Sequence, residues 1–104
     1  MGRKYTRETR RIEALLREHF PGYCPDHPPE AYRYNSASIR VRLVDKAFEG
    51  KSLVEREKMV IPVLESLPEN TLADITILLL LTPAEMSNSL MSLEFDQPTP
   101  SPIR

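Results

Sequence analysis

Hydrophobic and polar residues change their spacing along this chain, and each change marks the boundary of a predicted element. Between residues 6 and 20 the apolar side chains recur every three or four positions, which is the spacing of one helix face. From Ile39 to Val44 they alternate with polar residues, as in a strand with one buried face. Helical spacing returns over residues 53–67, and Ile75 to Leu81 is a nearly unbroken apolar run. The pattern therefore predicts helix, strand, helix and strand in this order.

Local signals set the ends of the two helices. Thr6 is expected to cap the first helix, and Ser52 to cap the second, with Glu55 completing a capping box. Gly50 is expected to supply a turn that needs positive φ. Pro62 falls inside the second helix, where it removes one backbone hydrogen bond. We therefore expect a kink at Pro62, or a helix that restarts with Pro62 in its first turn.

The segment between the first helix and the alternating strand is rich in proline. Four prolines between residues 21 and 30 exclude a helix or a central strand, so this segment is predicted as a loop. A short strand is expected over Ala31–Tyr34, with a turn at Asn35-Ser36 that leads into the alternating strand.

The order of the elements predicts how they pack. A right-handed crossover through the second helix places the strands on either side of it parallel in one sheet, and both long helices then cover one face. The run Ile75–Leu81 is typical of a strand covered on both faces, so Leu78 and Leu80 need a cover on the far face. We expect residues 83–95 to supply it as a short helix, with a second chain as the alternative. The apolar residues expected in this cover are Met86, Leu90, Met91 and Leu93.

Composition narrows the class of protein. Hydrophobic residues at 40% and charged residues at 28% are typical of a globular domain. Together with the order of the elements, this predicts one α+β domain over residues 1–95, with a mixed sheet of three strands. Proline-rich residues 96–104 are predicted to be a flexible tail. A net charge of −1 supplies no field that attracts nucleic acid or an anionic membrane. A lone Cys24, no apolar leader and no run long enough to span a bilayer favour a cytoplasmic protein away from the membrane.

Residues that suggest catalysis or a metal site are few. The serines lie in a predicted turn, a helix cap and the tail, and nothing in the sequence pairs the acidic residues as acid and base. We therefore expect a protein that is not an enzyme. Cys24 and His27 form a C-x-x-H pair, which has the spacing of two metal ligands. Only His19 and Asp26 lie near enough in sequence to complete such a site, and the interpretation without metal is favoured.

Arg40 and Arg42 are the clearest candidates for binding. Two arginines on one sheet face can grip carboxylates or phosphates through two hydrogen bonds each. The interpretation that we favour is structural, with the arginines paired across strands to Asp74 or Glu30, or solvated.

One stretch of the chain resembles a known family. The resemblance rests on Arg40-Val41-Arg42-Leu43-Val44-Asp45, Phe48-Glu49-Gly50-Lys51-Ser52, Glu55-Arg56 and Leu81-Thr82-Pro83-Ala84-Glu85. Residues 39–85 are similar to the BolA family, and the first helix is in the corresponding place. The resemblance implies an α-β-β-α-β fold related to the KH architecture, and a non-enzymatic role. It also implies pairing with a monothiol glutaredoxin, a shared iron–sulfur cluster, and action in stress responses or transcription.

The chain departs from this family where the cluster ligands would lie. Ser38 and Asp74 occupy positions at which the family carries histidine or cysteine, and Glu57 replaces a common histidine. Serine and aspartate are poor ligands for an iron–sulfur cluster, which favours thiolate and imidazole. Cys24 is the one thiol that could substitute for them.

The first hypothesis is therefore a divergent BolA-like adaptor, without a cofactor, that binds another protein or a second copy of itself. The residues assigned to partner binding are Arg40, Arg42 and Asp74 on the sheet face, and Phe48, Lys51 and Arg56 around the turn. Core packing is the alternative for Phe48. Two other hypotheses stay open: a cluster-sharing protein that uses Cys24 and His27, and a KH-like nucleic-acid-binding regulator that uses the arginines and the basic first helix.

Overall fold

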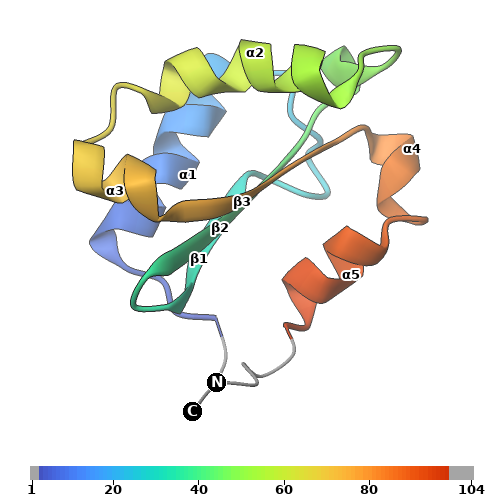
Figure 1. The fold of residues 1–104 in the computed structure, drawn as a ribbon. Helices are drawn as coiled ribbons and strands as arrows, with labels where there is room; N and C mark the ends of the chain where they lie inside the picture. Colours follow the sequence, from blue (N-terminus) through green and yellow to red (C-terminus); the bar gives the residue numbers. More distant parts are fainter. Residues whose placement is uncertain (1–2, 99–104) are drawn as a thin grey trace.

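A three-stranded sheet with helices on both faces forms the protein in the computed structural model, which describes residues 3–98 (Figure 1). Its elements are α1 (Arg7–His19), β1 (Glu30–Asn35), β2 (Ser38–Val44), the 3-10 helix η1 (Lys46–Phe48), α2 (Leu53–Leu64), α3 (Glu69–Asp74), β3 (Ile75–Leu81), α4 (Pro83–Met86) and α5 (Leu90–Asp96). The strand order is β1-β2-β3, with β2 antiparallel to β1 and parallel to β3. The predicted α+β fold, mixed sheet and parallel crossover are confirmed.

The helix starts follow the predicted caps. The Thr6 side chain accepts a hydrogen bond from the backbone of Thr9 at the start of α1. Ser52 and Glu55 form the predicted capping box of α2, in which each side chain accepts from the backbone N–H of the other residue. Gly50, just before it, has a φ of 76°, as the turn required.

The end of α2 differs from the prediction. The helix runs through Pro62 without restarting and ends at Leu64. Pro62 lies so close to the C-terminal end that the backbone bond it lacks interrupts only the last turn. The apolar spacing nevertheless continues to Leu67, which is buried in the loop after the helix. The periodic pattern therefore extended past the helix, and it did not indicate the short helix α3.

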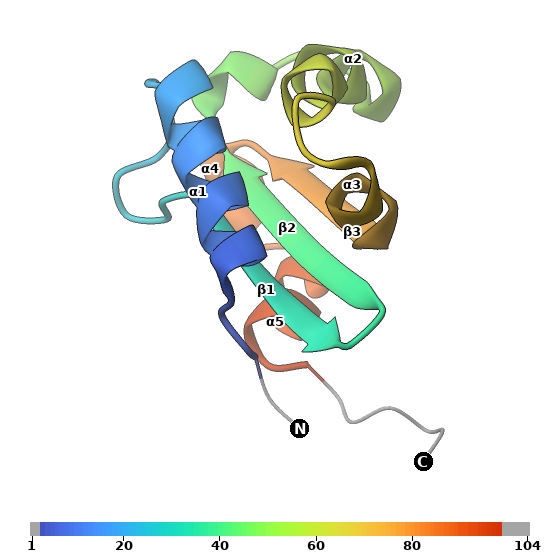
Figure 2. The ribbon, with the colours of Figure 1, turned by 90° about the vertical axis from the view of Figure 1, so that its left-hand side faces the viewer.

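The main core lies between the sheet and α1, α2 and α3, which all lie on one side of it in Figure 2. The predicted packing of both long helices on one face is confirmed. Its fully buried members are Ile12, Leu16, Ala31, Ile39, Val41, Leu43, Phe48 and Val60. Alternation along β2 places Ile39, Val41 and Leu43 in this core, and it turns Arg40 and Arg42 to the opposite face.

β3 differs from the prediction in two respects. Leu80 belongs to the main core and Leu78 packs against it. Both therefore lie on the side of α1, α2 and α3, and not on the far face as expected. The register with β2 shifts between Ile75 and Ile77, and this shift sets which side chains face the helices. Within β3 only Leu80 and Leu81 are buried, because β3 is an edge strand rather than a central one.

The opposite face of the sheet is covered by the C-terminal segment, as predicted, but by other side chains. α5 buries Ser92 and Phe95. Leu90, Met91 and Leu93, which were expected to form the cover, are exposed instead. α5 ends at Asp96, and most of the predicted tail, residues 99–104, lies outside the described residues. Within residues 3–98 no helix has both the length and the apolar character to cross a membrane.

Candidate functional site

The six residues that the sequence assigned to partner binding do not form one surface. Arg40 and Arg42 lie under α5 on one face of the sheet, whereas Phe48 lies in the core on the other. Lys51 and Arg56 are near the start of α2. The structure therefore separates the two groups with the sheet itself.

Arg42 is held by several side chains and is only 4% exposed. Its Nη1 donates to Ser92 Oγ at 2.9 Å and lies 3.0 Å from an Asp96 carboxylate oxygen. Its Nη2 lies 3.6 Å from a Glu30 oxygen, and the guanidinium carbon is 4.6 Å from the centre of the Phe95 ring. The pairing with Glu30 across β1 and β2 that the sequence favoured is confirmed.

Arg40 is held in a similar way. Its Nη1 donates to Glu94 at 3.0 Å, and its guanidinium carbon lies 3.8 Å from the centre of the Tyr34 ring. The Nε atoms of Arg40 and Arg42 are both buried without a hydrogen-bond partner. α5 of the same chain covers both side chains, so neither arginine is simply solvated, and a partner could reach them only in place of α5.

Asp74 does not share this face, although the sequence predicted that it lies there with Arg40 and Arg42. It is the last residue of α3, and its carboxylate lies 3.1 Å from an Arg33 Nη2 atom. The predicted pairing of Asp74 with Arg40 or Arg42 is thus replaced by a pairing with a β1 arginine. The sequence did not indicate α3, and without α3 the position of Asp74 could not be inferred.

Around the turn, Phe48 takes the core-packing alternative and Lys51 is exposed. Arg56 is buried and joins three elements. Its guanidinium donates to the Leu80 carbonyl of β3 at 2.9 Å, and to both Glu85 carboxylate oxygens of α4 at 2.7 and 3.0 Å. Hydrogen bonds from Arg56 lower the pKa of Glu85 to about 2. The geometry thus assigns Arg56 a structural role.

The Cys24–His27 pair forms part of the ordered loop. The Cys24 N–H donates to the Val44 carbonyl at 2.8 Å, and the His27 N–H donates to the Cys24 carbonyl at 3.0 Å. Across residues 3–98 no three histidine, cysteine or acidic side chains come together in a group that could hold a metal ion.

A groove that no sequence pattern indicated lies beside β3. It has a volume of about 380 Å³ and is lined by Glu57, Ile61 and Leu64 of α2, Leu72 of α3, and Ile75, Thr76 and Leu78 of β3. Figure 2 shows β3 at the edge of the sheet, with α3 beside it.

The main chain of β3 presents hydrogen-bonding groups on its outer side. The Leu81 carbonyl accepts from the Asp45 N–H on the β2 side, whereas the Leu80 carbonyl accepts from Arg56 on the other side. Consecutive residues of a strand direct their main-chain groups to opposite sides, so those of Leu78 point the same way as those of Leu80, away from β2.

Apolar side chains extend this surface onto α2. Leu53, Val54 and Ile61 are exposed, and their spacing places them on the helix face that also carries Glu57 in the groove. β3 itself contains no charged residue. Natural edge strands usually carry charges or prolines that prevent pairing with another chain, and this one does not. The uncharged run was visible in the sequence, but its edge position was not.

Comparison of the sequence with protein-family models gives no match, and comparison with curated proteins gives none either. The BolA resemblance over residues 39–85 therefore stays a prediction.

Proposed function

We propose that the protein is a non-enzymatic adaptor that binds an extended segment of another protein along the outer edge of β3. The observation that carries this proposal is the groove beside an uncharged edge strand. A peptide that adds a strand to such an edge gains affinity from main-chain hydrogen bonds. It gains specificity from the alternate side chains that enter neighbouring pockets.

The geometry limits the register of the added strand. The N–H and C=O of Leu78 and the N–H of Leu80 are directed at the partner, whereas Arg56 already occupies the Leu80 carbonyl. The added strand therefore ends opposite Leu80. Alternate residues of the added strand enter a groove with apolar walls. Glu57, on the α2 side of this groove, favours a basic residue in the part of the partner that lies beside it.

Selection from a displayed library of random linear peptides tests the proposal without knowledge of the natural partner. We expect selected peptides with alternating apolar residues and a lysine or arginine near one end. Amide hydrogen exchange with the bound peptide then identifies the site. The Leu78 and Leu80 amides should become protected on binding, while the amide of Leu79, which faces β2, should change little.

Two matched substitutions provide the control. Ile61→Lys places a charge in the groove and should weaken peptide binding by about tenfold or more, a change of about 1.4 kcal/mol. Leu93→Lys places the same charge on α5, on the other side of the sheet, and should leave binding unchanged. The absence of selected peptides, or unchanged exchange at Leu78 in a complex, would contradict the proposal. If sedimentation shows a dimer, and hydrogen exchange shows that the Leu78 amide is protected in the chain alone, the partner is a second copy of this chain.

A further inference from the structure

α5 turns acidic side chains and one aromatic ring toward the sheet, and its leucines away from it. Its buried side chains are Ser92 and Phe95, whereas Leu90 is 81% exposed and Leu93 is 58% exposed. A surface helix normally turns its apolar stripe toward the core. The sheet face therefore selects this helix by its charges and its aromatic ring rather than by its leucines.

The contacts come chiefly from three consecutive residues, Glu94, Phe95 and Asp96. Arg40 lies 3.0 Å from Glu94, and Arg42 lies 3.0 Å from Asp96. The Phe95 ring is 4.8 Å from the Tyr32 ring, centre to centre. We call the sheet surface made by Tyr32, Tyr34, Arg40 and Arg42 the arginine face.

Tyr32 adds a directional contact to this surface. Its hydroxyl donates to the Phe95 carbonyl at 2.6 Å. Burial raises the pKa of Tyr32, so this hydroxyl stays protonated and able to donate. The arginine face thus recognises a main-chain carbonyl and an aromatic ring as well as the two flanking carboxylates.

The arginine face is not fully satisfied by α5. The carboxylates of Glu94 and Asp96 both meet Nη1 atoms, and the Nε atoms of Arg40 and Arg42 stay buried without a partner. A carboxylate that approaches a guanidinium along its Nε edge takes two parallel hydrogen bonds instead of one. A ligand with this approach would therefore satisfy the arginines better than α5 does.

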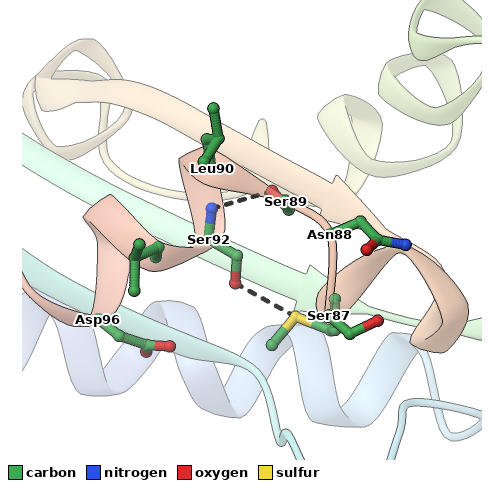
Figure 3. A pocket seen from close by; sticks show the side chains of 8 residues that line it. Ser87, Asn88, Ser89, Leu90, Ser92 and Asp96 are labelled. Carbon is green, nitrogen blue, oxygen red and sulfur yellow. Dashed lines mark hydrogen bonds between the residues drawn. The ribbon is translucent and has the colours of Figure 1, made fainter.

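The connection between α4 and α5 is short and loosely packed. Figure 3 shows a surface hollow beside the Ser87–Ser89 turn, which has a volume of about 250 Å³. The side chain of Ser92 reaches the Met86 sulfur across it at 3.3 Å. Ser87 and Asn88 in the turn are exposed, and no residue of α5 belongs to the main core. Detachment of α5 would therefore leave the main core intact.

We propose that the arginine face is a binding site for a protein segment in which two acidic residues flank an aromatic residue, and that α5 occupies this site as an internal ligand. This site is separate from the β3 groove, which lies at the sheet edge against α2 and α3. An external segment must displace α5, whose effective concentration as a tethered ligand is on the order of millimolar. Weakening α5 therefore opens the site to a ligand in solution.

A competition experiment tests the proposal. The full chain is compared with its Glu94→Gln/Asp96→Asn variant, which keeps the shape of α5 but removes both of its carboxylates. The probe is a fluorescein-labelled peptide with the sequence of residues 87–98. We expect the variant to bind this peptide about tenfold or more tightly than the unchanged chain, because the competing internal ligand is weaker. Circular dichroism verifies that the variant is folded.

Changes in the peptide identify what is recognised and do not depend on protein folding. A peptide with glutamine and asparagine in place of its two acidic residues should lose binding to the variant chain. A peptide with Leu90→Gln should keep it. Adding Arg40→Gln to the variant chain should abolish binding, whereas adding Ile61→Lys should not affect it.

Equal binding by the acidic and the neutral peptide would overturn the proposal, and so would an unchanged affinity in the Arg40→Gln chain. The absence of binding to a folded Glu94→Gln/Asp96→Asn variant would overturn it as well. None of these results bears on the β3 groove, whose test depends on Ile61 and the Leu78 amide.

Discussion

The two faces of the sheet are held by different kinds of interaction. Against α1 and α2 the sheet presents Ile39, Val41 and Leu43, all of them inaccessible to solvent. Against α5 it presents Arg40, Arg42 and Tyr32. The arginines form ion pairs with α5, and Tyr32 packs against the buried Phe95 ring and donates a hydrogen bond to the Phe95 carbonyl. The first face is specified by shape and apolar area, and the second by the positions of a few charges.

This difference has consequences for stability. Full burial of one large apolar side chain contributes about 1.5–3 kcal/mol to the free energy of folding, and the main core contains many such side chains. A partly exposed ion pair contributes about 0–1 kcal/mol, and a buried donor without a partner costs about 1–3 kcal/mol. The sheet face against α1 and α2 should therefore contribute most of the folding free energy. The arginine face contributes little, so α5 can be replaced there by another ligand.

The largest expected effect on stability comes from a substitution in the main core. Phe48 is 0% exposed and lies beside Phe20, with ring centres 6.4 Å apart. Phe48→Ala should lower the free energy of unfolding by about 3–5 kcal/mol, through lost apolar burial and the cavity it leaves. Urea unfolding measures this change. Leu93→Ala on the outer side of α5 is the control and should change stability by less than about 0.5 kcal/mol.

The same truncation on the other face sharpens the comparison. Phe95 is 2% exposed but packs against one tyrosine ring and one guanidinium. Phe95→Ala should lower the free energy of unfolding by only about 1–3 kcal/mol, because α5 can detach and relieve the cavity. Hydrogen exchange should reveal lost protection in α5 with the β2 amides unchanged. A loss as large as that of Phe48→Ala would contradict the distinction between the two faces.

Acid should weaken the link between α2 and α4. Hydrogen bonds from Arg56 hold the pKa of Glu85 at about 2, below its usual value in an unfolded chain. The stabilisation from this pair is therefore present above the unfolded pKa and is lost as the pH falls through about 4 toward 2. Glu85 is nearly half exposed, so the effect should not exceed about 1 kcal/mol.

The pH dependence of urea unfolding measures this loss. Glu85→Gln removes the titrating group and should flatten the stability curve between about pH 5 and pH 2 relative to the unchanged chain. An equally steep curve in Glu85→Gln would assign the acid sensitivity to other carboxyl groups.

The two long helices and the strands were predictable from the sequence because their signals are local, whereas α3 was not. The capping box at Ser52 and Glu55, the glycine turn and the apolar run of β3 each depend on neighbouring residues, and each is confirmed. The positions of Arg40 and Arg42 on one face followed from alternation. What covers them did not, because that depends on a helix some 50 residues later in the chain, which turns its acidic side chains and Phe95 inward and leaves its leucines exposed.

The β3 groove was beyond prediction for a similar reason. Whether the run Ile75–Leu81 forms a central or an edge strand depends on the strand order, which no local pattern encodes. The shift of register after Ile75 also changed the face on which Leu78 lies. A single added residue in a strand reverses the side-chain pattern that follows it, and the sequence carries no sign of it.

The smallest expected effect tests whether an ion pair matters for its face or only for its own energy. Arg33–Asp74 and Arg40–Glu94 have nearly equal distances, 3.1 and 3.0 Å, and both carboxylate side chains are about one-third exposed. Asp74→Asn and Glu94→Gln should each lower the free energy of unfolding by about 1 kcal/mol or less. Only Glu94→Gln should speed hydrogen exchange in α5, because Asp74 lies at the end of α3 and does not hold that helix. Equal exchange in the two variants would mean that the Arg40–Glu94 pair does not retain α5, and that the contacts of Arg42, Tyr32 and Phe95 hold it to the sheet.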